Sequence, residues 1–219
     1  MKLWPDVLQQ SDEWFALREW RPTASNAKRV ITATGKDSTS WQGYVEEMVD
    51  SEIRPRAVRM AGMFQGNRHT DRGNECESAA RECFAEKMGM DVAEVGFITR
   101  DDEVWGCSPD GLVVSRSAMM ESAGLELKCP DGPKHLGFLS DGTLPAEYLQ
   151  QIHCSMVVTG FSFWYFMSYC ELYKPLIIRV ERDSYTAKVE SAMNRFQVFY
   201  KSFRHLLLKF KAEPKESIL

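Results

Sequence analysis

Hydrophobic and polar residues repeat at helical spacing through most of the first third of the chain. The pattern predicts a helix over 41–53 and a second over 74–88, which ends at a glycine able to adopt the left-handed conformation that closes a helix. Residues 11–32 are predicted as two helical pieces, because Pro22 cannot continue a helix. The stretch 54–73, rich in Arg and Gly, is predicted as a long loop.

The spacing changes to that of strands in the middle of the chain. Short segments rich in β-branched and aromatic residues, bounded by Gly or Pro, predict strands over 95–100, 104–114 and 124–130. Polar residues separate these three strands, so they are expected to form two successive hairpins. Two further strands, both expected to be well buried, are predicted over 161–170 and 175–183.

Helices precede and follow the last two strands. One is predicted over 145–159, before Gly160, and a long amphipathic helix over 184–211. The element order is three helical segments, three strands, a helix, two strands and a final helix. This order predicts an α/β fold built on a mixed sheet.

Composition excludes several classes of protein. The chain of 219 residues is 44% hydrophobic and 26% charged, as in ordinary soluble globular proteins, and no apolar run is long enough to cross a membrane. The N-terminal segment lacks the features of a secretory signal, so we expect a cytoplasmic protein. Six scattered cysteines form no CxxC pair, and they predict reduced thiols in place of disulfides, a zinc site or an iron–sulfur cluster.

Charge is unevenly distributed along the chain. The net charge of −4 gives no general sign of nucleic-acid binding, but positive charge is concentrated in residues 14–36 and 54–72. These two stretches could line a groove for a polyanion. They fit equally well as solvated basic loops, and charge alone does not decide between the two.

The most specific chemical pattern combines SPDG (108–111) with LELK (125–128). Because side chains alternate along a strand, Glu126 and Lys128 point to one side and the two leucines to the other. Asp110 comes from the neighbouring strand of the predicted hairpin and is expected to share the site. Two carboxylates on an otherwise apolar sheet repel each other unless a cation lies between them. Oxygen ligands at this density suit Mg²⁺ or Mn²⁺ better than zinc.

A lysine two residues after a metal ligand has a specific chemical use. The ammonium group of Lys128 can orient the attacking water or neutralise charge that develops on a phosphate. Together with a metal-activated water, it predicts phosphodiester hydrolysis. The four histidines are scattered along the chain, so catalysis by a Ser/His/Asp or Cys/His set is not indicated.

Each of the two motifs also has an ordinary structural explanation. A Glu-x-Lys pair on a strand is common by chance, and SPDG is a typical type I turn. The motifs lie on adjacent predicted strands, however, and Glu126 and Lys128 are the only charged residues of segment 124–130. This combination favours the catalytic interpretation.

Seven segments between residues 14 and 183 share their order with one known family. They are WFALR (14–18), TAS (23–25), CSPDGL (107–112), GLELKCP (124–130), YLQQ (148–151), WYF (164–166) and RVERD (179–183). In these segments the chain resembles bacteriophage lambda exonuclease and the related viral-recombinase exonucleases of the PD-(D/E)xK superfamily. The resemblance implies a restriction-endonuclease-like core, with a central mixed β-sheet flanked by helices. It also implies one nuclease domain over 1–219, with a helical and loop elaboration (1–73), the core (74–183) and a C-terminal helix and tail (184–219).

The same resemblance implies an activity, cofactors and partners. The activity is Mg²⁺-dependent 5′→3′ digestion of one strand of linear double-stranded DNA from 5′-phosphorylated ends, giving mononucleotides and a 3′ overhang. Two Mg²⁺ ions are implied, and Mn²⁺ is expected to substitute for them. The implied partners are double-stranded DNA ends, two further copies in a homotrimer ring and a phage single-strand annealing protein, with no membrane. The implied location is the cytoplasm of a bacterial host cell.

Residue roles follow from the family motifs in the same way. The residues that resemble metal ligands are Asp110, Glu126, the main-chain carbonyl of Leu127 and, near a second metal, Glu77. Lys128 resembles the catalytic lysine, and Gln151 the helix glutamine that helps to hold Lys128 and the water. The residues that resemble a pocket for the 5′-phosphate are Arg18, Ser25 and Ser108. An arginine fork beside two hydroxyls is a sensible receptor for a monophosphate.

Several of these assignments have alternatives. Glu75 lies beside Glu77 and Gln150 beside Gln151, and either pair could simply be exposed helix residues; Arg18 could pair with a neighbouring acid.

The chain also departs from the family pattern. The lambda enzyme splits the duplex end with an apolar wedge, and this chain has His69 and Thr70 at about that place, with Met63 or Phe64 as possible substitutes. Four tryptophans in the first 41 residues favour core packing over stacking on a base.

Two other functions remain open at this point. A PD-(D/E)xK endonuclease, restriction-like or structure-specific, would use the same core and would cut closed circular DNA. A catalytically inert DNA-end-binding protein would keep the fold only. The complete set of Asp110, Glu126 and Lys128 argues against the inert protein, because carboxylates that repel each other cost stability without a metal to hold.

Overall fold

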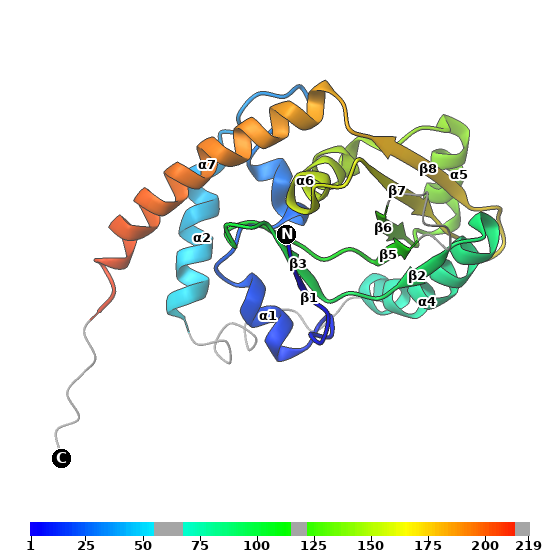
Figure 1. Cartoon of the computed structure of the whole chain (residues 1–219), viewed down its shortest axis with the longest axis horizontal. Coiled ribbons are helices and arrows are strands. Elements are labelled where there is room, and N and C mark those ends of the chain that lie inside the picture. The colour runs from blue at the N-terminus through cyan, green and yellow to red at the C-terminus, as the bar shows by residue number, and fades with distance from the viewer. Residues whose placement is uncertain (55–67, 115–121, 213–219) are drawn as a thin grey trace, which may run out of the picture.

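The structure, a computed structural model, describes residues 1–54, 68–114 and 122–212, and for 68–75 it describes the main chain only (Figure 1). A five-stranded mixed sheet lies at its centre, with strand order β2-β5-β6-β7-β8. These strands are β2 (Asp91–Ala93), β5 (Gly111–Val114), β6 (Ala123–Lys128), β7 (Phe163–Ser168) and β8 (Leu176–Glu181). Neighbouring strands are antiparallel except β6 and β7, which are parallel and therefore need a helical crossover between them. The predicted α/β fold with a mixed central sheet is confirmed.

Helices cover both faces of this sheet (Figure 1). The α-helices are α1 (Asp12–Arg18), α2 (Trp41–Ile53), α4 (Arg68–Met88), α5 (Gly132–Asp141), α6 (Leu149–Thr159) and α7 (Ser184–Leu208). Two short 3₁₀ helices are η1 (Ala24–Arg29) and η2 (Ala146–Tyr148). The crossover between β6 and β7 consists of α5, η2 and α6.

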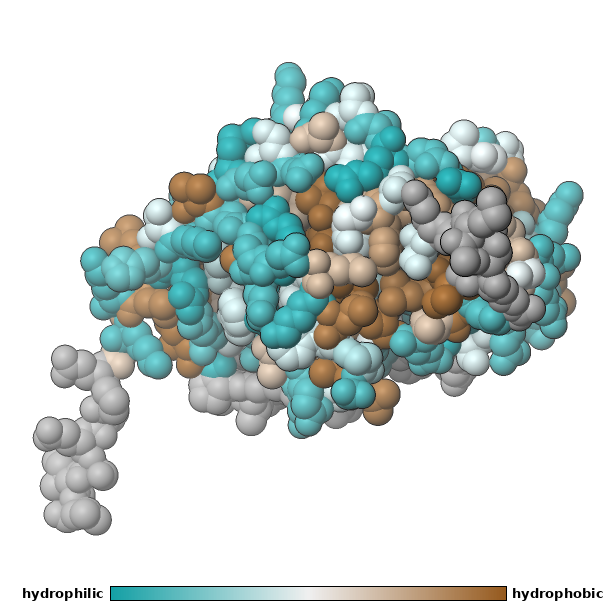
Figure 2. Space-filling model, viewed as in Figure 1, coloured by the Kyte–Doolittle hydropathy of each residue, from teal (hydrophilic) through white to brown (hydrophobic). Residues whose placement is uncertain are grey.

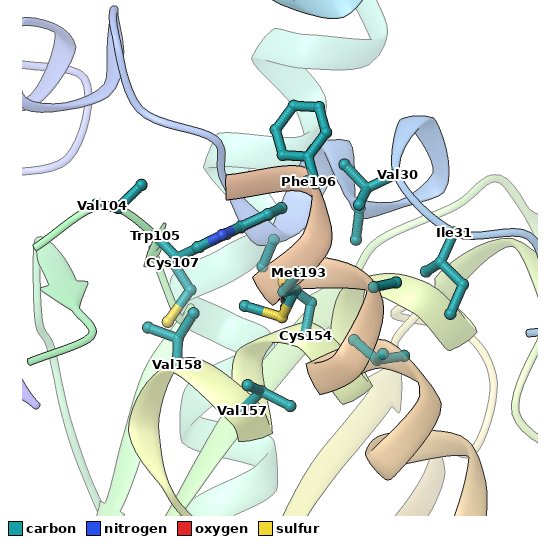
Figure 3. Close-up of a cluster of buried hydrophobic side chains, with 14 of the residues drawn as sticks. Val30, Ile31, Val104, Trp105, Cys107, Cys154, Val157, Val158, Met193 and Phe196 are labelled. Carbon is teal, nitrogen blue, oxygen red and sulfur yellow. Dashed lines mark hydrogen bonds between the residues drawn. The ribbon is translucent and has the colours of Figure 1, made fainter. Parts of the chain in front are cut away.

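Side chains of β7 alternate between two hydrophobic cores, as the two-residue period of a strand requires. Tyr165 packs with Leu125 of β6 and with Phe84 of α4 in one core. On the other face, Trp164 belongs to the core that includes Phe196 of α7. Figure 3 shows the part of this core around Phe196 and Met193. Because Leu125 points into the α4 core, Glu126 is directed to the opposite face, where α6 lies.

A second, three-stranded sheet corrects one predicted strand. β1 (Lys2–Trp4), β3 (Phe97–Thr99) and β4 (Gly106–Cys107) form this sheet in the order β1-β3-β4. The predicted strand 104–114 is therefore two strands, since β4 pairs with β3 and β5 pairs with β2 and β6. Pro109 lies between them and cannot donate to a strand ladder, so the chain turns there into the other sheet.

The other differences between the observed and the predicted elements are confined to short or exposed elements. The strands β1 and β2 have three residues each, too few to show a period, and α5 contains two glycines and a proline, a loop-like composition. Helix α4 begins at Arg68, inside the predicted loop. The prediction that both last strands are well buried was wrong for β8, which is an edge strand and therefore only partly covered.

Several element ends agree with the predictions. Helix α2 has the predicted limits, and Gly89 and Gly160 follow α4 and α6 with positive φ of 63° and 78°. Asp183 begins α7 with a capping box completed by Thr186.

The surface is mostly hydrophilic, as the share of charged residues in the sequence leads one to expect. Hydrophilic residues cover most of the face seen in Figure 2, with hydrophobic residues gathered towards its centre. Within the described ranges, no helix is both long and apolar enough to cross a membrane.

Only one of the four N-terminal tryptophans packs in the core as expected. Trp105 and Trp164 are fully buried, whereas Trp4, Trp14 and Trp41 are only partly buried and Trp20 is 36% exposed. Core packing was therefore the wrong expectation for Trp4, Trp14 and Trp20, but it is confirmed for Trp41, which packs against the core that includes Phe196. Trp14 instead donates a hydrogen bond to the hydroxyl of Ser108.

Candidate active site

Asp110 is held in place by the main chain of β6. Its backbone N–H donates to the carbonyl of Leu125 (2.9 Å), and its carboxylate accepts from the N–H of Leu127 (2.7 Å). The pairing of Gly111 with Leu125 continues this arrangement into β5. The SPDG turn and the LELK strand are therefore brought together as the sequence predicted.

Glu126 and Lys128 project from β6 beside Asp110. The Lys128 Nζ contacts the Glu126 Oε1 and lies 3.9 Å from the Asp110 Oδ2. Gln151 of α6 donates to the same Glu126 oxygen (2.6 Å). The side chains are 3% exposed for Glu126, 14% for Asp110 and 29% for Lys128, so the two acids are withdrawn from water and the lysine is only partly exposed.

Burial is the strongest influence on the pKa values of the two acids in this cluster. It raises the pKa of Glu126 to about 7, with Lys128 opposing the rise and Asp110 adding to it. Burial also raises the pKa of Asp110, again against the effect of Lys128. Burial alone would lower the pKa of Lys128, but the two carboxylates outweigh it and raise that pKa. The two acids thus share one cation, and the site favours additional positive charge.

Glu77 approaches the cluster from α4. Burial raises the pKa of Glu77, and the negative charge of Asp110 raises it further. Arg81, one turn later on the same helix, donates to the carbonyl of Asp110 (3.1 Å) and to Glu94 (2.7 Å). Arg81 therefore fixes α4 against the SPDG turn, and its sequence position alone does not predict this contact. Glu77 is close enough to Asp110 and Lys128 for their charges to affect its pKa but does not line the cavity of the site, whereas the side chain of Glu75 lies outside the described residues.

Arg18, Ser25 and Ser108 also come together. The Arg18 guanidinium donates to the hydroxyl of Ser108 (2.9 Å) and to that of Ser25 (3.2 Å). Among the described residues, Arg18 forms no ion pair with a carboxylate, so the alternative of a simple surface salt bridge does not hold. Thr23 adds a hydroxyl 3.1 Å from that of Ser25.

One cavity of about 170 Å³ joins both groups of residues. Its lining comes from the N-terminal segment, the SPDG turn, β6 and α6, and consists of Gln9, Trp14, Arg18, Ala24, Ser25, Cys107, Ser108, Asp110, Glu126, Lys128, Gln151 and Ser155. The guanidinium of Arg18 and the ammonium of Lys128 thus share a space with two carboxylates. A phosphate group and a divalent cation are the kinds of ligand that this mixture of charges suits.

A divalent cation would fit here only with additional oxygen ligands. Within the described part of the chain, no three His, Cys, Asp or Glu side chains converge closely enough to hold a metal by themselves. Asp110 and Glu126 would provide two ligands, and the Leu127 carbonyl with water or phosphate oxygens would complete the set. Mg²⁺ commonly keeps several waters in this manner, so the donor set is compatible with it.

Four residues of the site were not predicted from the sequence. Gln9 donates to the carbonyls of Val95 (3.0 Å) and Pro109 (2.8 Å), and Trp14 donates to Ser108 (2.9 Å). The others are Arg81 and Tyr148, the latter with its ring centroid 5.6 Å from the Lys128 Nζ. Gln9 donates to main-chain carbonyls that are distant in sequence, and no pattern in the sequence indicates such a contact. Trp14, Arg81 and Tyr148 lie one helical turn or less from predicted residues, and that spacing could have indicated them.

The two basic stretches have different outcomes. In the first, Arg21 is 6% exposed and donates to main-chain carbonyls of Glu103 and Leu17, and Arg29 pairs with Glu47. Arg21 and Arg29 thus have partners within the protein, although both also line a cavity of about 200 Å³ together with Arg18. Most of the second stretch, including Met63 and Phe64, lies outside the described residues, as do the side chains of His69 and Thr70.

Comparison with known proteins identifies a family and several solved structures that are similar to this chain. Residues 13–162 match the profile of the YqaJ-like viral recombinase domain family. The chain is similar to the structure of an alkaline exonuclease (LHK-Exo) from Laribacter hongkongensis, with 28% identity and a TM-score of 0.73 over 91% of this chain and 97% of that one. The complex of LHK-Exo with dAMP is similar at 26% identity and a TM-score of 0.68, over 91% and 99% of the two chains.

A phage-related exonuclease from Haemophilus somnus 129PT shares the fold at 16% identity and a TM-score of 0.63, over 86% of this chain and 96% of that one. No curated protein matches the sequence. Together with the sheet order, these neighbours establish a restriction-endonuclease-like fold.

Proposed function

The chain belongs to the YqaJ-like viral recombinase domain family, and from this premise we propose that it is a Mg²⁺-dependent exonuclease acting on double-stranded DNA. It digests one strand in the 5′→3′ direction from 5′-phosphorylated ends. The products are mononucleotides and a 3′ overhang suited to single-strand annealing recombination. The similarity to the alkaline exonuclease LHK-Exo, also crystallised with the mononucleotide dAMP, supports this reaction class.

One observation carries the proposal. A single cavity is lined by both the acid–lysine cluster and the arginine–hydroxyl pocket, whose members are Asp110, Glu126, Lys128, Arg18, Ser25 and Ser108. A nuclease that begins at a strand end needs these two functions at a fixed separation. One group of residues binds the terminal phosphate, and the other cleaves the next phosphodiester.

The chain's own residues perform distinct tasks in this scheme. Asp110, Glu126 and the Leu127 carbonyl would hold one Mg²⁺, and Glu77 would help to hold a second. When bound, Mg²⁺ lowers the pKa of a coordinated water and neutralises phosphate oxygens, and Mn²⁺ is expected to substitute for it. The Lys128 ammonium stabilises negative charge on the phosphate as it forms. Gln151 holds the Glu126 carboxylate through its hydrogen bond, which keeps that carboxylate oriented towards the cavity.

Digestion of linear duplexes with each end separately labelled and phosphorylated tests this proposal, with and without Mg²⁺. We expect Mg²⁺-dependent release of mononucleotides from 5′-phosphorylated ends only. Nicking of covalently closed circular DNA would instead identify an endonuclease. DNA binding without any Mg²⁺-dependent cleavage would identify an inert end-binding protein.

End recognition has its own test in Arg18→Ala. Since Arg18 is the only described cation that donates to both Ser25 and Ser108, its removal is expected to lower kcat/KM at 5′-phosphorylated ends by about 100-fold, the loss of a charge-assisted bond of roughly 3 kcal/mol. At 5′-hydroxyl ends the loss is expected to be much smaller. Equal losses on both substrates would remove Arg18 from phosphate recognition.

We further propose that the enzyme works as a homotrimeric ring around its DNA, beside a phage single-strand annealing protein. A closed ring would explain how a chain of net charge −4 stays on DNA, because only the channel wall needs positive charge. Sedimentation is expected to give three times the chain mass of 25.1 kDa. A monomer at all concentrations would contradict the ring and leave the chemistry unaffected.

A further inference from the structure

Trp14 contacts two of the three residues predicted for the phosphate pocket, Arg18 and Ser108. Helix α1 places Trp14 and Arg18 four residues apart and hence on the same face. The indole Nε1–H donates to the Ser108 hydroxyl (2.9 Å) and to the Gly96 carbonyl (3.0 Å). The Arg18 guanidinium carbon lies 4.2 Å from the centroid of the Trp14 ring. One side chain therefore contacts both the arginine and the serine of the pocket.

The hydrogen bonds to Ser108 determine where its hydroxyl hydrogen points. Its oxygen accepts from Trp14 (2.9 Å) and from Arg18 (2.9 Å), two groups that can only donate. Both lone pairs of that oxygen are then used. No acceptor for the hydroxyl hydrogen of Ser108 is present among the described residues, and Ser108 lines the cavity. The O–H is thus left to donate to a ligand in the cavity.

The environment of Arg18 indicates that this ligand is an anion. The faces of Trp14 and Phe97, with centroids 4.2 and 5.9 Å from its guanidinium carbon, support Arg18 in place of a carboxylate. Aromatic faces hold a guanidinium without cancelling its charge. The positive charge of Arg18 therefore stays available to an anion that enters the cavity.

We propose that Trp14 is a positioning residue that gives the proposed exonuclease its preference for 5′-phosphorylated ends. A phosphate accepts hydrogen bonds on every oxygen, so it is satisfied by the Ser108 O–H and by Arg18 together. A 5′-hydroxyl end has no negative charge to match Arg18. The inference rests on the proposed function and adds the residue that aligns the two phosphate-binding groups.

The variant Trp14→Phe separates this role from simple packing. Phenylalanine keeps an aromatic face for Arg18 but removes the N–H that fixes Ser108. We expect kcat/KM at 5′-phosphorylated ends to fall about tenfold, mainly through KM, which corresponds to one hydrogen bond. The loss at 5′-hydroxyl ends is expected to be clearly smaller. Equal losses at the two ends would overturn the proposal.

Trp4→Phe is a matched control. The Trp4 Nε1–H also donates to a hydroxyl, that of Thr99 (3.4 Å), and Trp4 does not line the cavity. It is expected to leave the ratio of kcat/KM between phosphorylated and hydroxyl ends unchanged. An equal change of this ratio in Trp4→Phe and Trp14→Phe would attribute the effect to loss of any tryptophan and contradict the proposal.

A double-mutant cycle with Ser108→Ala completes the test, and Ser108→Ala alone remains informative if Trp14→Phe is unstable. Ser108→Ala alone is expected to reduce the preference for phosphorylated ends, since it removes the donor that Trp14 orients. Adding Trp14→Phe should then have little further effect on that preference. Fully additive effects would show that Trp14 acts independently of Ser108. Absence of Mg²⁺-dependent cleavage by the unaltered protein would refute the proposed function itself, an outcome distinct from all of these.

Discussion

Asp110 and Lys128 show what single charged residues cost when they are buried at this site. Asp110 carries its charge where burial disfavours it, and Lys128 is the cation that both carboxylates share. The pKa of Asp110 is raised in the folded protein, so its ionised form costs folding free energy at every pH above the ordinary carboxyl range. A metal ion would offset that cost only when bound.

Asp110→Asn is expected to stabilise the metal-free protein while it abolishes cleavage. At pH 8 the variant loses a buried negative charge, yet its side-chain oxygen can still accept from the Leu127 N–H. The melting temperature in the presence of a chelator is expected to rise, by about 2 to 4 °C for each kcal/mol gained. Asp101→Asn, at a side chain that is 89% exposed, provides the control and should change little. A lower melting temperature for Asp110→Asn would argue against burial as the dominant effect.

Lys128→Ala is expected to reduce kcat by roughly 100- to 1,000-fold, because it removes a donor that acts on charge developing in the transition state. DNA binding, measured by fluorescence anisotropy in Ca²⁺, should change far less. Lys87→Ala, at an exposed position in the last turn of α4, serves as the comparison. If binding and kcat fell together, Lys128 would be a docking residue.

At the scale of elements, the junction between α6 and α7 depends on one buried histidine. His153 is 2% exposed, and its Nδ1 lies 2.7 Å from the Thr186 hydroxyl in the cap of α7 and 3.7 Å from the Asp183 carboxylate. Burial lowers the pKa of His153 despite the opposing effect of Asp183, while Arg182 lowers it further. The folded protein therefore contains neutral His153 at pH 7.

This lowered pKa predicts the direction of an effect on stability. An unfolded histidine takes up a proton near its ordinary pKa of about 6.5, before the folded one does. The contribution of His153 is thus complete above about pH 6.5 and is lost as the pH falls towards its lowered pKa. Between pH 7 and 5, His153→Gln should lose less free energy of unfolding than the unaltered protein, measured by urea denaturation. His205→Gln, at an exposed position of α7, should follow the unaltered protein; identical slopes for all three would contradict the assignment.

At the scale of the whole molecule, ion binding and folding are expected to be linked. If the acid pair holds Mg²⁺ with a Kd of about 1 mM, then about 10 mM Mg²⁺ would add roughly 1.4 kcal/mol of stability by mass action. The melting temperature of the unaltered protein would rise by about 3 to 6 °C. In the Asp110→Asn variant, most of this rise in melting temperature should be absent. An equal rise in both proteins would indicate ion binding elsewhere.

Much of the site could be predicted because its chemistry is local in sequence. The alternation along β6 placed Glu126 and Lys128 on one side and Leu125 and Leu127 in the core, as the structure has them. The hairpin of β5 and β6 then brought Asp110 to the same place. Arg18, Ser25 and Gln151 lie far from this hairpin in sequence, and only the resemblance to a known family indicated them.

The sequence by itself determined the main helices, the mixed sheet and the acid–lysine cluster, because hydrophobic period, turn residues and strand alternation act over a few residues. Only the tertiary structure decided that SPDG passes between two sheets, that β8 is an edge strand, and that Trp14 supports Ser108 and Arg18 instead of a core. These features depend on which distant segments meet. The long-range packing that brings them together, such as Trp14 against Gly96 and Ser108, has no periodic signature along the chain.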